Sequence, residues 1–433
     1  MGKPGTTGTA DDTAVIGAAT EFEPDVMDLL VETLRQAGRR ELTYVGTDTL
    51  LGQLVLGDTD AGAAIAPGMR KAGSLSGVIS GRAGRGWASD DLAPPTQAGA
   101  GAGAGADADA DAGADHVADG AEVDAAWREA RWRVGSGSRG PATGSSPALP
   151  PMSGALRACL LLAIGSARAE GTISVRCRHV ARALLDLPDT RAREALLLRQ
   201  ADLAAASAAL DRLDASAPAE TERPESRGVT LLRRAGTLGR SGNVLTRALT
   251  SWASGSTENG SPVLFAVSVE AMRQAVRCGR ATVEPVDLLL GILALDRALY
   301  VAGRALPAGL ESANSAPSLL RRHGVRQVSL FSLVSSASAA PPAADPRPTD
   351  GSDAGRVRRS AAVERVTAKA ELSAAEHRSP TVGTVHLLSA LLDEPETADS
   401  SADTGTCGAV TALAAERVDV TALRAELTLR LSA

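Results

Sequence analysis

The sequence predicts an all-α protein. Hydrophobic residues make up 44% of the 433 residues but aromatic residues only 2%, and most of the apolar residues are Ala, Leu and Val. Close-packed helices use such side chains, whereas sheets favour β-branched and aromatic residues. Apolar residues also recur at helical spacing in several stretches. The chain is long enough for two or three domains, each with its own hydrophobic core.

The first predicted helix follows Phe22, and its apolar residues recur every three or four positions as far as Ala37. After a short turn, Thr47 is expected to cap a second helix with its hydroxyl, and Asp48 lies in the first turn of that helix, where a negative charge favours the dipole. The apolar residues of the second helix are Leu50, Leu51, Leu54 and Val55.

The same pattern recurs three more times along the chain. These blocks begin near Leu156, Val263 and Val363, and each continues through a short turn into a compact helix rich in leucine. Two further helices are expected to close each block. In the second block we assign them to residues 229–252, because an Ala- and Arg-rich helix over 191–213 and a polar loop come first.

Other segments cannot form a core. Residues 98–115 alternate Gly with Ala and then Asp with Ala, so we expect a disordered insert over about 80–150. A short charged helix around residues 122–134, which carries Trp127 and Trp132, is expected to interrupt it. Further flexible segments are predicted at residues 1–20, 255–261 and 335–356.

The formal net charge of -6 gives no basic excess, so the sequence does not favour a nucleic-acid partner. No apolar stretch is long enough to span a bilayer, and residues 1–20 lack the apolar segment of a signal peptide. The cysteines Cys159, Cys177, Cys278 and Cys407 show no CxxC spacing, which argues against a zinc site and for cytosolic thiols. We therefore expect a cytoplasmic protein with no membrane partner.

The segments 44–51 (Tyr-Val-Gly-Thr-Asp-Thr-Leu-Leu) and 382–388 (Val-Gly-Thr-Val-His-Leu-Leu) resemble the repeat of the N-terminal domain of Clp unfoldases. The hallmark of that repeat is Ile/Val-Gly-Thr-Glu-His-Leu-Leu. In this family two repeats of about four helices pack into one pseudo-symmetric domain. The resemblance implies two such domains here, over residues 21–254 and 262–433, with the predicted segments 80–150 and 335–356 as inserts and 255–261 as linker.

The motif also has a physical rationale. Glycine permits a tight turn, threonine caps the helix that follows, and the leucine pair docks that helix on its neighbour. A single occurrence would be a weak signal. Its recurrence at the same place in a four-helix block is stronger.

In some family members this domain binds phosphorylated arginine through the motif Glu, assisted by a Thr at the start of the first helix. The equivalent positions here are Asp48, Arg178, Val286 and Val385. Arg178 would repel a guanidinium, and valine offers no acceptor, so we do not expect this ligand. The candidate ligand- or partner-binding residues are Glu23, which replaces the expected hydroxyl, and Thr47, Asp48, Arg178, His179, Ser360, Thr384 and His386.

The sequence carries no sign of an active site. The phosphate-binding loop of the Clp ATPase modules, G-x-x-x-x-G-K-[ST], is absent, as are the G-x-S-x-G and H-E-x-x-H motifs. No pair of histidines has ligand spacing, so cap or core roles are favoured over metal binding. We expect no cofactor, no metal and no catalysis.

The sequence therefore predicts a non-catalytic protein-binding module of the Clp protease system. It would act as an adaptor, a decoy or a regulator that binds Clp subunits or their substrates. The alternative is a scaffold of an unrelated pathway that retains the fold, because a fold alone does not establish a function.

Overall fold

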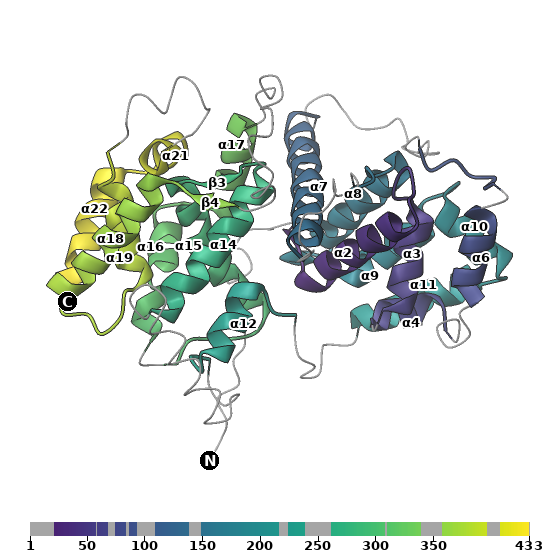
Figure 1. Cartoon of the computed structure of the whole chain (residues 1–433), viewed down its shortest axis with the longest axis horizontal. Coiled ribbons are helices and arrows are strands. Elements are labelled where there is room, and N and C mark those ends of the chain that lie inside the picture. The colour runs from purple at the N-terminus through teal and green to yellow at the C-terminus, as the bar shows by residue number, and fades with distance from the viewer. Residues whose placement is uncertain are drawn as a thin grey trace, which may run out of the picture. The chain divides into compact units, whose positions relative to one another are not determined.

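The computed structural model describes residues 21–57, 59–67, 74–83, 86–92, 109–137, 149–215, 224–238, 261–307, 310–338, 357–395 and 408–432. The described chain is predominantly helical, which confirms the predicted all-α class (Figure 1). Its strands are two residues long. None of the described helices combines the length and the apolar character needed to cross a bilayer.

The chain forms two compact units, and the boundary between them falls between Thr221 and Glu222. In the N-terminal unit the elements are β1 (Glu21–Phe22), α2 (Pro24–Arg39), α3 (Thr47–Leu56), α4 (Asp60–Ile65), α6 (Ser74–Ala83), α7 (Asp109–Gly137), α8 (Gly154–Ala169), β2 (Ser174–Val175), α9 (Cys177–Asp186), α10 (Arg191–Leu198) and α11 (Leu203–Ala215).

The C-terminal unit begins with a short helix and then repeats a similar order of elements. They are α12 (Arg227–Arg234), α14 (Pro262–Arg277), β3 (Thr282–Val283), α15 (Pro285–Val301), η2 (Glu311–Asn314), α16 (Ala316–Arg322), α17 (Gln327–Ser338), β4 (Arg358–Arg359), α18 (Ala361–Glu376), α19 (Thr384–Leu392), α21 (Ala409–Ala415) and α22 (Val420–Ser432).

The spacing of the helices is the same in all four blocks. The first helix of each block, α2, α8, α14 or α18, is 16 residues long. Each second helix begins 24 residues after the N-cap residue of the first. The N-cap residues are 23, 153, 261 and 360, and the second helices begin at 47, 177, 285 and 384. The blocks therefore share one register.

A serine begins the first helix in three of the four blocks. The hydroxyls of Ser153, Ser261 and Ser360 each accept a hydrogen bond from the backbone N–H three residues later, at 3.1 to 3.3 Å. Such an N-cap satisfies one of the donors that a helix start leaves unpaired. Glu23 makes no such bond, but Pro24 follows it and has no N–H to satisfy.

Within each unit the two blocks are joined reciprocally. In the N-terminal unit β1 pairs with β2 in parallel, so the start of α2 lies beside the start of α9. A bridge between Val45 and Met152 likewise brings the start of α3 beside the start of α8. In the C-terminal unit β3 pairs with β4, and the Ser261 hydroxyl donates to the Val382 carbonyl at 2.6 Å.

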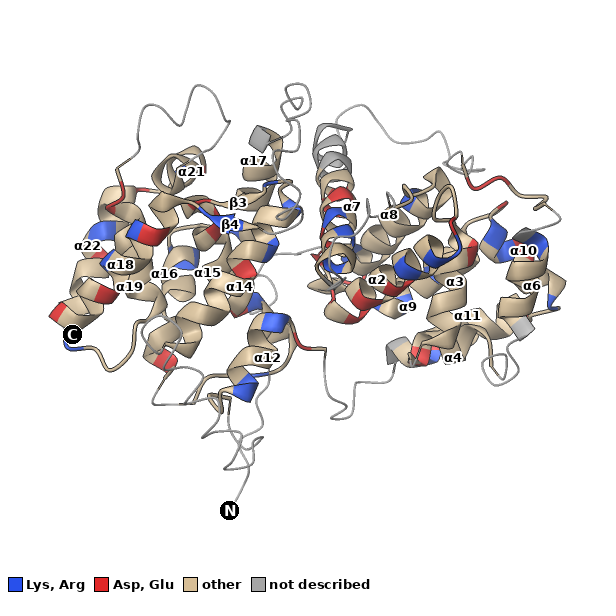
Figure 2. Ribbon diagram, in the orientation of Figure 1, with Lys and Arg blue, Asp and Glu red and all other residues tan. Residues whose placement is uncertain are grey.

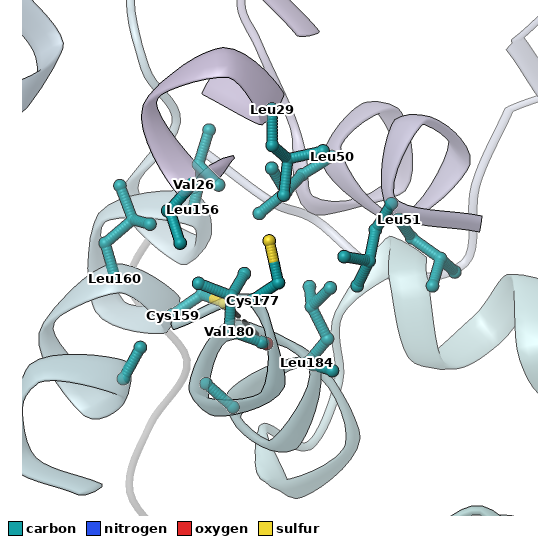
Figure 3. Close-up of a cluster of buried hydrophobic side chains, with 14 of the residues drawn as sticks. Val26, Leu29, Leu50, Leu51, Leu156, Cys159, Leu160, Cys177, Val180 and Leu184 are labelled. Carbon is teal, nitrogen blue, oxygen red and sulfur yellow. Dashed lines mark hydrogen bonds between the residues drawn. The ribbon is translucent and has the colours of Figure 1, made fainter. Parts of the chain in front are cut away.

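The core of the N-terminal unit draws on both blocks. Figure 3 shows side chains of α2 and α3 meeting those of α8 and α9, with Cys159 and Cys177 among them. The two leucine pairs that were predicted to dock their helix on its neighbour are fully buried. They are Leu50, Leu51, Leu387 and Leu388, all 0% exposed. The docking role that we predicted for them agrees with this burial.

The predicted disordered insert contains regular structure. Helix α7 spans 29 residues and packs on α2 and α8, with Val123, Ala126, Trp127 and Ala130 in the core. It carries both acidic and basic residues (Figure 2). The prediction of disorder over about 80–150 is therefore wrong for residues 80–83, 86–92 and 109–137, apart from the short helix that was expected around 122–134. Residues 93–108 and 138–148 lie outside the described residues.

Helix α12 belongs to a different unit from the one that we expected. We assigned residues 229–252 to the end of the first domain, but α12 packs on α14 and α15 in the C-terminal unit. Glu270 of α14 explains this, because its carboxylate accepts hydrogen bonds from the Ser226 hydroxyl (2.7 Å) and the Gly228 N–H (3.2 Å) at the start of α12. Residues 239–260, 339–356 and 1–20 lie outside the described residues.

Candidate functional site

The motif residues lie at the start of the second helix in each block. In three blocks the third residue of that helix caps it. His179 Nδ1 accepts from the Arg176 N–H at 2.9 Å, and His386 Nδ1 accepts from the Gly383 N–H at 3.0 Å. Asp287 does the same for the N–H of Glu284 at 2.8 Å. The motif histidine is thus a capping residue in this chain.

These caps require neutral histidines, because only an unprotonated Nδ1 can accept. Burial lowers the pKa of both His179 and His386, and the neighbouring His377 lowers the pKa of His386 further. The sequence interpretation missed Asp287, although it occupies the same position and offers the same kind of acceptor. A search for any acceptor at that position would have found it.

We predicted that the motif threonine caps its own helix, and this prediction is wrong. Thr47 and Thr384 are each the first residue of a helix whose N-cap is a glycine. Their hydroxyls accept instead from the N–H groups of Ala192 at 3.1 Å and Ala316 at 3.2 Å, at the start of α10 and α16. Those helices belong to the other block of the same unit, so the threonine joins two blocks.

The motif glycine is needed for space and not for an unusual backbone angle. Gly46 and Gly383 have φ near -100°, which any residue can adopt. A Cβ at Gly46 would lie 2.5 Å from an oxygen of Asp48 and 2.9 Å from one of Asp91. At Gly383 it would lie 3.1 Å from the backbone of Ala313. The predicted reason, a tight turn, is therefore corrected to close packing.

Asp48 is buried in the first turn of α3, with 6% of its surface exposed. Burial first and the nearby Asp91 second raise the pKa of its carboxyl to about 6, while Arg191 opposes this shift. A carboxylate at a helix start ordinarily gains from the dipole, as the sequence suggested. Here desolvation outweighs that gain.

The carboxylate that accepts hydrogen bonds from the N–H groups at the starts of α3 and α10 belongs to Asp91, which is 0% exposed. Its Oδ2 accepts from the N–H of Thr47 at 2.6 Å and from the Thr47 hydroxyl at 2.8 Å. Its Oδ1 accepts from the N–H of Arg191, the first residue of α10, at 2.9 Å. No local pattern marks Asp91, because its partners lie 44 and 100 residues away in sequence.

A cation completes this cluster. The guanidinium of Arg191 lies 5.0 Å from the ring centroid of Tyr44 and 6.0 Å from that of Trp87, within the range of cation–π attraction. It also stabilises the ionised form of Asp48. The cluster thus holds two carboxylates, two aromatic rings and one guanidinium, all from the same unit.

The other candidate charges of the N-terminal unit are paired as well. Glu23 accepts from the hydroxyl of Ser174 at 2.6 Å and from Nε of Arg176 at 3.1 Å. Arg178 donates to Glu170 at 2.5 Å. In the C-terminal unit the Ser360 hydroxyl is occupied as an N-cap. Each charged candidate is therefore engaged within its own unit.

Among the described residues, the thiols of Cys159, Cys177 and Cys278 offer no activated nucleophile. Burial and the neighbouring Asp25 raise the pKa of Cys177 well above its usual value, and burial raises that of Cys159. The nearby His179 uses Nδ1 for its cap. Among the described residues, no group of three or more His, Cys, Asp and Glu side chains is placed to hold a metal ion.

Comparison of the chain with protein-family models, with curated proteins and with solved structures finds no match. The role of the site is therefore inferred from its residues. Two features matter most. The motif residues bind other parts of their own unit, and the charged candidates are neutralised there.

Proposed function

We propose that this chain is a non-catalytic protein-binding module of the Clp protease system, acting as an adaptor, a decoy or a regulator. Its partners would be Clp subunits or the proteins that they degrade. Each unit would correspond to one domain of the Clp N-terminal type, built from two blocks.

The observation that carries the proposal is the shared register of the four blocks. A 16-residue first helix and a 24-residue interval recur in all of them, and the blocks of each unit are joined through the starts of their helices. Paired helical repeats of this kind are what the resemblance to the Clp N-terminal domain implies. The Gly-Thr segments at residues 46–47 and 383–384 add the sequence signature at the equivalent place.

The state of the charged residues favours protein contacts over a small charged ligand. Arg178 is bound to Glu170, and Asp48 lies beside Arg191. A guanidinium ligand would have to displace an internal guanidinium from the only motif position that keeps a carboxylate. Recognition of a partner through a broad helical surface requires no such exchange.

Affinity capture from native cytoplasm tests the proposal. The tagged chain is expected to enrich Clp subunits or Clp substrates. The control is Leu51→Asp, which places a carboxylate at a fully buried core position and should unfold the N-terminal unit. Enrichment that is equal for both chains, or that involves an unrelated assembly, would contradict the Clp assignment.

Catalytic activity is the opposite outcome and is simple to measure. ATP turnover by the pure chain, at a rate that survives further purification and is lost in a core variant, would replace the binding proposal with an enzymatic one. We expect no turnover, because no phosphate-binding loop is present in the sequence.

A further inference from the structure

Residues 86–92, called the latch below, run across the starts of three helices of the N-terminal unit. Asp91 binds α3 and α10 through its carboxylate, as described above. Its backbone carbonyl accepts from the N–H of Ala155 at 3.0 Å, and the carbonyl of Leu92 accepts from the N–H of Gly154 at 3.1 Å. Both donors belong to the first turn of α8. The latch thus supplies acceptors to first-turn N–H groups of α8 and α10 that the N-cap side chains of Ser153 and Thr190 leave unpaired, and to the N–H of Thr47 at the start of α3.

The other end of the latch is fixed to α10. Glu194 accepts from the N–H groups of Ala88 at 2.9 Å and Ser89 at 3.0 Å. Trp87 contributes the ring that lies near the guanidinium of Arg191. The latch is therefore a polar contact with few buried apolar side chains, since Leu92 is 57% exposed and only Asp91 is fully buried. Contacts of this kind belong to the regions that open most readily.

The carboxylate of Asp48 lies where its negative charge disfavours closure of the latch. An oxygen of Asp48 and an oxygen of Asp91 both lie within 3.0 Å of the point where a Cβ of Gly46 would stand, so they are less than 6 Å apart. Asp48 is itself only 6% exposed, and the closed latch holds a second carboxylate beside it. Both effects disfavour the ionised form of Asp48.

We propose that the latch is a pH-sensitive closure of the N-terminal unit, in which the carboxylates of Asp91 and Asp48 compete. When Asp48 is neutral, the latch stays closed over α3, α8 and α10. When Asp48 is ionised, the latch opens more often and frees the N–H groups of Thr47, Gly154, Ala155 and Arg191. This inference goes beyond the proposed binding function and does not depend on it.

The remaining charges around Asp48 define the balance. The charge of Arg191 of α10 lowers the pKa of Asp48 and so favours its ionised form. Asp90 lies on the latch itself. Glu194 of α10 holds the latch and approaches Arg82 of α6 at 3.8 Å. Tyr44, which precedes α3, remains neutral over the range considered, because burial raises its pKa.

The sign of the effect follows from linkage. In the closed state burial and the neighbouring Asp91 together hold the pKa of Asp48 at about 6, and an opening that exposes this carboxyl returns its pKa toward the ordinary value of about 4. The open state therefore binds the proton less tightly. The opening constant is lowest below about pH 4, rises as the pH approaches 6 and then levels off. Full exposure on opening gives about a tenfold increase between pH 5 and pH 7.

Amide hydrogen exchange of the intact chain, resolved by residue and corrected for the intrinsic rate at each pH, measures this equilibrium. The amides of Thr47, Ala155 and Arg191 are expected to lose about tenfold in protection between pH 5 and pH 7. The amide of Val180, which is bonded within α9, serves as the internal control. It should change far less.

Two variants separate the latch from general instability. Asp48→Asn removes the titrating group and should flatten the pH dependence at the latch to less than twofold. Asp25→Asn removes a half-buried carboxyl whose pKa is also raised to about 6 but which lies at the start of α2, and it should leave the latch profile unchanged. An equal change at Val180, or a pH dependence that persists in Asp48→Asn, would overturn the proposal.

Discussion

Replacing Thr47 with valine should destabilise the N-terminal unit by about 2–4 kcal/mol. The two side chains have nearly the same shape, so the change removes little more than a hydroxyl. That hydroxyl accepts from the Ala192 N–H and donates to Asp91. Ala192 is 0% exposed, and a buried donor left without an acceptor costs about 1–3 kcal/mol. The lost bond to a carboxylate accounts for the remainder.

Thr33 offers a matched control in the same unit. It is also 0% exposed, but its hydroxyl donates to the carbonyl of Leu29 in its own helix at 2.7 Å. Thr33→Val leaves no buried N–H without an acceptor, so it should lower the free energy of unfolding by less than about 1 kcal/mol. Urea unfolding followed by tryptophan fluorescence measures both, because three of the four tryptophans lie in this unit. Equal losses in the two variants would refute the role assigned to Thr47.

Three further predictions concern other sites. Asp25→Asn should stabilise the N-terminal unit by about 2 kcal/mol at pH 8 and have little effect at pH 4, because the ionised form of this half-buried carboxyl opposes folding as the pH rises from about 4 to 6. Equal effects at both pH values would contradict this. Gly291→Ala should cost at least about 2 kcal/mol, since its Cβ would lie 2.7 Å from a carbonyl of α14, whereas Gly165→Ala, with nothing within 4 Å, should be neutral or stabilising in thermal unfolding. His386→Ala should cost about 1 kcal/mol, and His386→Asp should recover most of it in the same assay, because Asp287 caps α15 in that way.

The helices that build the blocks could be predicted because their signal is local. Val26, Leu30 and Leu34 recur at helical spacing, and all three are 0% exposed in the structure. Helix α7 could not be predicted in full, because its first residues alternate Asp with Ala and carry no apolar stripe. Its later turns place Val123 and Trp127 in the core, against α2.

The positions of the motif residues could be predicted better than their contacts. Thr47 and Asp48 begin α3 and His386 lies in the first turn of α19, as the motif indicated, whereas a binding role for them stays a prediction. Their partners come from elsewhere in the chain: the Thr47 hydroxyl meets a residue 145 positions later. Asp91 could not be predicted from the sequence, because an Asp in a polar stretch has nothing that distinguishes it from a surface residue. Contacts over such intervals are fixed by the fold, which local patterns do not specify.

The most direct test of the proposed function uses purified components. The intact chain is titrated into a purified Clp unfoldase by calorimetry, and its effect on the degradation of a model substrate is followed in parallel. The proposal predicts saturable binding with a defined stoichiometry and a concentration-dependent change in the degradation rate. The absence of binding to the unfoldase and to its substrates, together with an unchanged degradation rate, would contradict it.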